Sequence, residues 1–204
     1  MYTETKVIST LDETAARSLT VLEASGVYIV DEGGRADTFL KAVANALVGN
    51  SIDNPLFEIE SFVELHVSMP CLVAVAGHAD VEVNGRRCDA WRALPVPAGG
   101  KVRVSVKKGI ACLAFSGLRG RLGRVEPGAR FALKPIEGCD GDLAARYVPL
   151  SLVHSYFNDG AREDILAKTL RHIRLACEMA RRGAKLVKVR VRGKIFDLWV
   201  EEVE

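Results

Sequence analysis

The strongest constraint on the fold is a run of short segments from Phe57 to about Leu133 in which apolar and polar residues alternate. In KVRVSV, at Lys101–Val106, every second residue is valine. This period predicts a strand with one buried face. Asn84-Gly85 is the strongest short signal for a hairpin, and Lys107–Gly109 is expected to turn the chain again. Strands this short, at this spacing, predict a closed or nearly closed antiparallel barrel.

One amphipathic helix is expected before these strands. Phe39, Val43 and Leu47 recur at intervals of four residues, which places them on one helix face. Gly49-Asn50 is a good stop, since both residues tolerate the left-handed conformation that ends helices. The sequence therefore predicts a mainly β domain with one early helix.

The second part of the chain is organised differently. A breakpoint lies around Pro135–Gly141, and Asp159–Gly183 predicts a second helix with Asp159 as its N-cap. Alternating residues from Val187 onwards predict a hairpin that turns at Gly193. The predicted division is a lead-in (1–20), the barrel (21–135), a connecting segment (136–158) and a C-terminal helix plus β-hairpin extension (159–204).

Composition excludes several classes of protein. The 204 residues, with 49% hydrophobic and 26% charged residues, are typical of a globular protein that buries a core. A net charge of +2 gives no general reason to expect nucleic acid or an acidic membrane as partner. No apolar run approaches the roughly 20 residues of a spanning helix. The N-terminus lacks the apolar core of a signal peptide, so we expect a cytoplasmic protein.

The cysteines and histidines do not predict a metal site. The five cysteines are scattered, with no C-x-x-C pair, which argues against a disulfide framework and against a cysteine zinc site. Outside the turn that contains His78, the histidines show no ligand spacing with one another or with carboxylates. We therefore expect no metal.

A family resemblance rests on ADTFLKAVANALVGNSIDNPLFEIE, at Ala36–Glu60. This segment resembles the MDPFALRLANLLVGN motif and the following Leu-Glu strand of the KipA-like family. That family comprises the KipA-like component of 5-oxoprolinase, also described as allophanate hydrolase subunit 2 or the urea amidolyase-related domain. The matching residues are Asp37, Phe39, Ala44, Asn45, Leu47, Val48, Gly49 and Asn50.

The resemblance covers about Val21 to Ser155 but omits two loops of the family. ACLAFSG, at Ala111–Gly117, resembles the family strand AYLAVAGG. The VQDLGRPGY-type stretch before the helix is missing, and only Gly34, Arg35 and Asp37 match around it. The GGIDVPPVLGSRST-like loop after the AYLAVAGG strand is also absent. These loops are expected to line the substrate cleft of the family.

The resemblance implies a cyclophilin-like antiparallel β-barrel and a place in a hetero-complex. Family members work with a KipI-like protein and a further component of 5-oxoprolinase to open 5-oxoproline with ATP, or act on related urea-derived amides. Because the cleft loops are missing, we interpret this chain as a non-catalytic or regulatory partner of a KipI-like protein. Two alternatives stay open: an active part of an ATP-dependent cyclic-amide hydrolase, and a standalone barrel that binds a small molecule such as an amide or lactam. ATP would belong to the complex, and we expect no cofactor bound directly to this chain.

Four residues are candidates for a cleft or substrate site. Arg35 and Asp37 lie at the predicted barrel mouth, although Arg35 could be solvated and Asp37 is favoured as a helix N-cap. Glu58, between apolar neighbours, could be partly buried and act as an acid or base, or could point outward from its strand. His78, in a GHAD turn, could donate to an anion or be simply exposed. No catalytic residue can be named from spacing.

Two further motifs name no reaction. GLRGRLGRVEPG, at Gly117–Gly128, lacks the Lys-Ser/Thr pair of a P-loop and is expected to be a β-turn loop with solvated basic residues. The tail weakly resembles the hairpin that opens biotin-carrier domains, but no E-A-M-K sequence follows and no biotin is expected. Nucleic acid is not expected either, because alternating charge on a hairpin is typical of a solvated face. The tail's basic residues are Arg181, Arg182, Lys185, Lys188, Arg190, Arg192 and Lys194.

Overall fold

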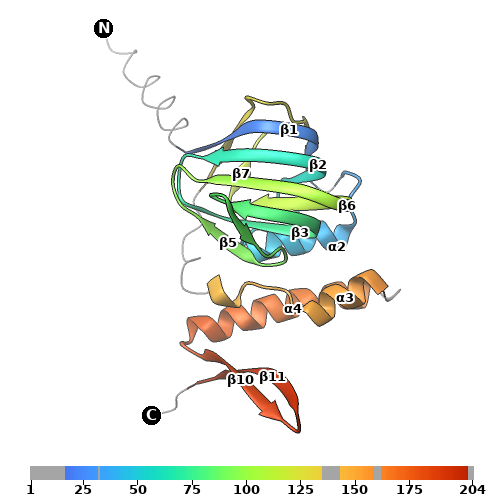
Figure 1. The fold of residues 1–204 in the computed structure, drawn as a ribbon, viewed down its shortest axis with the longest axis vertical. Coiled ribbons are helices and arrows are strands. Elements are labelled where there is room, and N and C mark those ends of the chain that lie inside the picture. The colour runs from blue at the N-terminus through green and yellow to red at the C-terminus, as the bar shows by residue number, and fades with distance from the viewer. Residues whose placement is uncertain (1–16, 32, 135–142, 159–161, 202–204) are drawn as a thin grey trace. The chain divides into compact units, whose positions relative to one another are not determined.

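A computed structural model describes residues 17–31, 33–134, 143–158 and 162–201 (Figure 1). The chain divides into two compact units, residues 1–137 and 138–204. The elements of the first unit are β1 (Ser18–Val30), α2 (Thr38–Leu47), β2 (Leu56–Val67), β3 (Cys71–Val83), β4 (Arg86–Cys88), β5 (Ala93–Val96), β6 (Lys101–Phe115), β7 (Leu118–Arg119), β8 (Gly123–Arg124) and β9 (Arg130–Leu133). Those of the second unit are a 3₁₀ helix η1 (Leu143–Ala145), α3 (Leu150–Asn158), α4 (Arg162–Arg181), β10 (Lys185–Val191) and β11 (Lys194–Val200).

The first unit is a single curled antiparallel sheet. Its strand order is β4-β3-β6-β2-β1-β9-β7, with β5 added beside β3 and β8 beside β1. Figure 1 shows the long strands β1, β2, β6 and β3 side by side as they wrap around the interior. The prediction of a mainly β, cyclophilin-like antiparallel barrel is confirmed. The described sheet ends on strands of three and two residues, β4 and β7, and such short edges discourage pairing with other chains.

Alternation along each long strand builds the interior core. In β2, Val63, Leu65 and Val67 are fully buried, while the residues between them are partly exposed. The same core contains Val102 and Val104 of β6, which come from the alternating hexapeptide. Apolar residues at every second position therefore face one another across the barrel, as the sequence pattern predicts.

Irregularities in four neighbouring strands lie along one line across the sheet. The β1–β2 register shifts at Gly26, between Ser25 and Val27, and the β2–β6 register shifts between Ile59 and Phe62. The β3–β6 register shifts just after Ala76. Extra residues of this kind increase the local twist of a strand and bend it, so the aligned shifts let the long strands curl into a barrel.

The prediction that the chain turns at Lys107–Gly109 is wrong. The residues belong to one continuous strand, β6, which runs through the line of register shifts. Gly109 has a φ of 69° and supplies the left-handed residue that the local signal indicated. The signal for an irregularity was correct, but the strand bulges there and does not reverse.

Helix α2 covers the outer face of β3 and β6. Its predicted apolar face is buried, with Phe39, Val43 and Leu47 at 2%, 0% and 0% exposure. The sheet meets the helix with small side chains that alternate with those of the barrel core and are themselves fully buried: Ala74, Ala76, Cys112 and Ala114. Small residues on the sheet allow the helix to approach closely, so this layer forms a second core outside the barrel.

Two asparagines of the family motif fasten the C-terminal end of α2. Asn45 is fully buried, donates to the carbonyl oxygens of Ile52 and Asn54, and accepts from the side chain of Asn50. The Asn50 side chain also donates to the carbonyl oxygen of Phe115 and accepts from the Gly117 N–H, both at 3.0 Å. These side chains replace backbone partners that a helix end lacks. The structure therefore gives both residues an architectural role.

The second unit differs from expectation in its first half. The segment predicted only as a connection, 136–158, contains η1 and the helix α3. The carbonyl oxygen of Pro149 accepts from the N–H groups of Leu152 and Val153, so a helical turn begins directly after the proline. The long helix is present as α4, which begins at Arg162; the predicted N-cap Asp159 lies outside the described residues.

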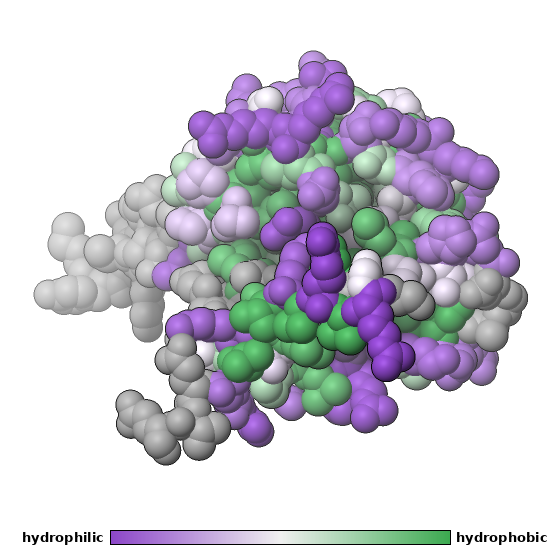
Figure 2. Space-filling view, turned by 60° about the horizontal axis from the view of Figure 1, so that its bottom comes forward, coloured by the Kyte–Doolittle hydropathy of each residue, from purple (hydrophilic) through white to green (hydrophobic). Residues whose placement is uncertain are grey.

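The predicted C-terminal hairpin is present as β10 and β11. Its turn residues Arg192 and Gly193 have φ values of 48° and 78°, as a tight two-residue hairpin turn requires. Apolar residues on the hairpin are substantially exposed, for example Val191 at 50% and Ile195 at 57%. Figure 2 shows hydrophobic residues exposed among hydrophilic ones on the face of the molecule that it presents. None of the helices in the described residues is long and apolar enough to cross a membrane.

Candidate functional site

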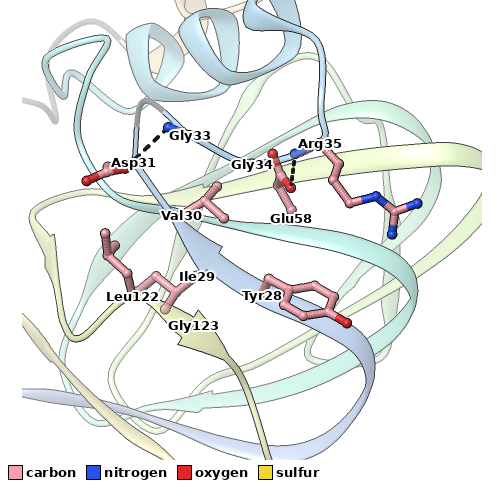
Figure 3. A pocket seen from close by; sticks show the side chains of 10 residues that line it. All are labelled: Tyr28, Ile29, Val30, Asp31, Gly33, Gly34, Arg35, Glu58, Leu122 and Gly123. Atoms are coloured by element: carbon pink, nitrogen blue, oxygen red, sulfur yellow. Dashed lines mark hydrogen bonds between the residues drawn. The ribbon is translucent and has the colours of Figure 1, made fainter.

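The glycine turn between β1 and α2 is held by the buried carboxylate of Glu58. Oε2 of Glu58 accepts from the backbone N–H of Arg35 at 2.8 Å, and Oε1 accepts from that of Ala36 at 2.9 Å. Glu58 points to the outer face of β2, opposite to its core neighbours Phe57 and Ile59, as one reading of the sequence had it, but the turn covers it and leaves it only 2% exposed. Figure 3 shows its side chain rising from β2 to the backbone of the turn. A carboxylate at this place also suits the positive end of α2, which begins two residues further on.

Gly34 is required at the centre of this turn. Its φ is +102°, a conformation that L-residues rarely adopt. A β-carbon on Gly34 would also overlap the carboxylate of Glu58. The double glycine of the DEGGR segment therefore allows the turn to pack closely against the carboxylate of Glu58.

Two charged residues, at the N-cap and in the first turn of α2, complete the anchoring of the turn. Oδ1 of Asp37 accepts from the Phe39 N–H at 2.8 Å, which makes Asp37 the helix N-cap that the sequence favoured. Nζ of Lys41, a residue only 8% exposed, donates to the carbonyl oxygen of Gly33 at 2.7 Å. Both side chains thus contribute to the local structure.

Arg35 points away from the buried acid. Its guanidinium donates to the carboxylate of Glu60, two residues along β2 from Glu58. The Arg35 side chain is 71% exposed and that of Glu60 is 33% exposed. The pair is therefore a largely solvated ion pair, and exchange with water or a ligand costs little.

A pocket of about 420 Å³ lies beside this turn, on the outer side of β1 (Figure 3). It is lined by Tyr28, Ile29, Val30, Asp31, Gly33, Gly34, Arg35, Glu58, Leu122 and Gly123. Two of the four sequence candidates, Arg35 and Glu58, are therefore together at one site. Asp37 is not among the lining residues, and His78 lies exposed on β3, paired with Lys108.

Sequence reasoning missed the apolar side of this pocket. Tyr28 and Val30 alternate with core residues of β1, and Leu122 comes from the glycine-rich loop, which the sequence predicts as a β-turn loop with solvated basic residues. β8 brings that loop to β1 by pairing Gly123 with Ile29. The alternation in β1 marks Tyr28 and Val30 as outward-facing, but no local signal brings Leu122 beside them.

Behind the pocket, Cys112 is a buried thiol and cannot act as a nucleophile. It is the cross-strand partner of Glu58 and is fully buried. Burial raises the pKa of Cys112 far above its usual range, and the charge of Glu58 raises this pKa further, while Lys41 acts in the opposite direction. The thiol therefore stays protonated. Among the residues that the structure describes, no three His, Cys, Asp or Glu side chains are placed to hold a metal ion.

Comparison with known proteins finds a family whose sequence model matches most of the barrel. Residues 28–126, just under half of the chain, match the sequence model of the family described as carboxyltransferase domain, subdomain A and B. This match and the solved neighbours fit the predicted resemblance to the KipA-like family. The match begins at Tyr28 and ends two residues after β8, so it contains every lining residue of the pocket. A search of curated proteins found no match.

Solved structures similar to this chain are much longer proteins. TTHA0988 is 21% identical with a TM-score of 0.53, over 59% of this chain and 31% of that protein. The urea amidolyase of K. lactis is 20% identical with a TM-score of 0.55, over 67% of this chain and 11% of that protein. The urea carboxylase of Kluyveromyces lactis is 18% identical with a TM-score of 0.52, over 60% of this chain and 14% of that protein. At these identities the likeness establishes the fold, and the chain spans less than a third of each neighbour.

Proposed function

We propose that the chain is a KipA-like, cytoplasmic component of a 5-oxoprolinase or allophanate hydrolase type complex, in which it is a non-catalytic or regulatory partner of a KipI-like protein. The carboxyltransferase A/B match supports membership of the family. The solved neighbours named as urea amidolyase and urea carboxylase are far longer than the matched region, which supports a role as one part of a larger assembly. ATP would be consumed by the assembly.

The observation that carries the non-catalytic role is the use of Glu58 inside the fold. Both of its oxygens accept backbone N–H groups, so neither is presented to a substrate as a free base. A general base must lie within hydrogen-bond reach of the proton it removes. Asp37 and Lys41 are likewise bonded to the backbone of the same turn and helix. The polar side chains near the turn therefore stabilise the barrel mouth.

A co-purification experiment tests the partner. The chain would be co-expressed with a KipI-like protein, with and without the remaining component of a 5-oxoprolinase, and passed over an affinity column and then a sizing column. We expect a stoichiometric complex with the KipI-like protein that survives both steps. Elution of the chain without the KipI-like protein, at micromolar concentrations of both, would contradict the proposal.

A kinetic experiment tests the non-catalytic role. Formation of glutamate from 5-oxoproline and ATP would be followed for the reconstituted assembly with this chain, without it, and with the Arg35→Gln variant. Asp53→Asn, which removes an exposed carboxylate outside the pocket, is the matched control. We expect no glutamate formation that requires Arg35. Turnover that depends on the chain and is lost in Arg35→Gln alone would establish the active-hydrolase alternative.

The pocket favours one second candidate, a standalone barrel that binds a small molecule. Its volume of about 420 Å³ lies within the range of known ligand sites. If the chain elutes as a single species without the KipI-like protein and retains a ligand from the cell, this candidate replaces the first.

A further inference from the structure

We infer that the pocket beside the glycine turn binds a small apolar cation, namely an ammonium group on a compact hydrophobic body. The inference concerns this chain alone and does not depend on membership of a complex. It rests on three properties of the pocket: its apolar walls, the charges that line it, and the aromatic ring at its edge.

The apolar walls of the pocket favour a ligand with a compact hydrophobic part. Ile29, Val30 and Leu122 line the pocket, and Leu122 is 47% exposed. Figure 3 shows the Leu122 side chain on one side of β1 and Tyr28 on the other. A ligand that covers Leu122 would remove apolar surface from water, which is the main source of affinity in sites of this kind.

The charges lining the pocket select a cation. Asp31 and Glu58 contribute carboxylates, and the only cationic side chain among the described lining residues, Arg35, is paired with Glu60. Oδ1 of Asp31 accepts from the Gly33 N–H at 3.3 Å, which leaves lone pairs of that carboxylate for a donor from a ligand. An ammonium group would donate to Asp31, whereas a ligand carboxylate would be repelled.

Tyr28 adds a face that also prefers a cation. Its half-buried ring lies at the edge of the pocket, and Tyr28 is the cross-strand partner of Glu58. Aromatic faces attract ammonium groups by cation–π interaction. Arg124 is the cross-strand partner of Tyr28 on β8, and its guanidinium is paired with the carboxylate of Glu126 at 2.9 Å. Tyr28 and Asp31 therefore both favour a cationic ligand.

The experiment compares three probes that share one apolar body. Benzylammonium, benzyl alcohol and phenylacetate would be titrated into the full chain, and backbone amide shifts of Gly33, Gly34 and Gly123 would report the occupied pocket. We expect saturable shifts with benzylammonium at a Kd of roughly 1 mM or below, weaker shifts with the alcohol and none with phenylacetate. Phenylacetate binding as tightly as benzylammonium, or no saturable shift with any probe, would overturn the inference.

Variants locate the interaction. Asp31→Asn keeps the acceptor for the Gly33 N–H and removes the charge, so it should weaken benzylammonium binding about fivefold and leave the alcohol unchanged. Asp53→Asn, outside the pocket, should change neither. Leu122→Ser, at an exposed position, should weaken both probes. Equal affinity of Asp31→Asn and the parent chain for benzylammonium would refute the role of the charge. Because only this chain is used, that result would leave the proposed complex untouched.

Discussion

The backbone of Gly34 lies so close to the carboxylate of Glu58 that a β-carbon at position 34 would overlap it. The neighbouring N–H groups of Arg35 and Ala36 donate to the same carboxylate. The turn and the acid are therefore fitted to each other, and neither residue can change alone without leaving the other strained or without its partners.

Gly34→Ala should lower the free energy of unfolding of the barrel by at least about 2 kcal/mol, because it adds the overlap with Glu58 to an unfavourable φ of +102°. Gly33→Ala is the matched control. A β-carbon there would meet only Oδ1 of Asp31 at 4.0 Å, so the change should stay within about 1 kcal/mol. Urea denaturation measures both. Equal losses in the two variants would show that Glu58 does not constrain the turn.

Glu58→Gln should destabilise the barrel by about 1–3 kcal/mol, because an amide has one acceptor oxygen where the carboxylate has two. The backbone amides of Arg35 and Ala36 should then exchange with solvent faster than in the parent chain. Glu60→Gln on the same strand is the control, since its exposed ion pair with Arg35 is worth about 1 kcal/mol or less. Unchanged exchange at both amides in Glu58→Gln would contradict the anchoring role.

The free energy of unfolding should fall as the pH rises above 9. Burial raises the pKa of Cys71 from 9.0 to about 12, and burial also raises the pKa of Cys112. Between pH 9 and 12 the unfolded chain therefore loses the Cys71 proton that the native barrel retains. The loss is at most about 1.4 kcal/mol per pH unit for each thiol. Urea titrations at pH 8 and pH 10 should show a smaller decrease for Cys71→Ala; parallel decreases would exclude a contribution from this thiol.

The C-terminal unit should lose stability as the pH falls below 6.5. Burial lowers the pKa of His172 from 6.5, and its Nε2 is buried with no hydrogen-bond partner in the described part of the chain. The ring instead packs edge-to-face on Tyr147 at 5.3 Å. The unfolded chain therefore takes up a proton that the native state resists, at a cost of up to about 1.4 kcal/mol per pH unit. Amide exchange in α4 at pH 7.5 and 5.5 measures this. His172→Gln should remove most of the difference, and an unchanged difference would assign it to other groups.

Local signals were sufficient for α2 and the hairpins. The N-cap Asp37 and the apolar face of the helix depend only on residues within the helix and its first turn, and the Asn84-Gly85 and Gly193 turns depend only on their own φ preferences. The sequence also marked Glu58 as an acid between apolar neighbours. Its partners could not be predicted, because they come from a turn more than twenty residues away that the β1–β2 register brings to it.

The pocket and α3 required information that alternation does not contain. Leu122 reaches Tyr28 only through the pairing of β8 with β1, which spans most of the barrel sequence. The segment that contains α3 was predicted only as a connection, and no helix was expected after Pro149. The fold class follows from periodicity, whereas the site follows from long-range register.

The aligned irregularities of β1, β2, β6 and β3 fix the register in which these strands pair. An alternating strand that slides by two residues still points its apolar side chains inward. The alternation alone therefore excludes shifts of one residue but does not distinguish registers that differ by two. An extra residue in β2 opposite Gly26, matched by shifts in the neighbouring strands, destroys that equivalence. Only one position of each strand brings all the irregularities together, and this gives a repetitive valine-rich sheet a unique alignment.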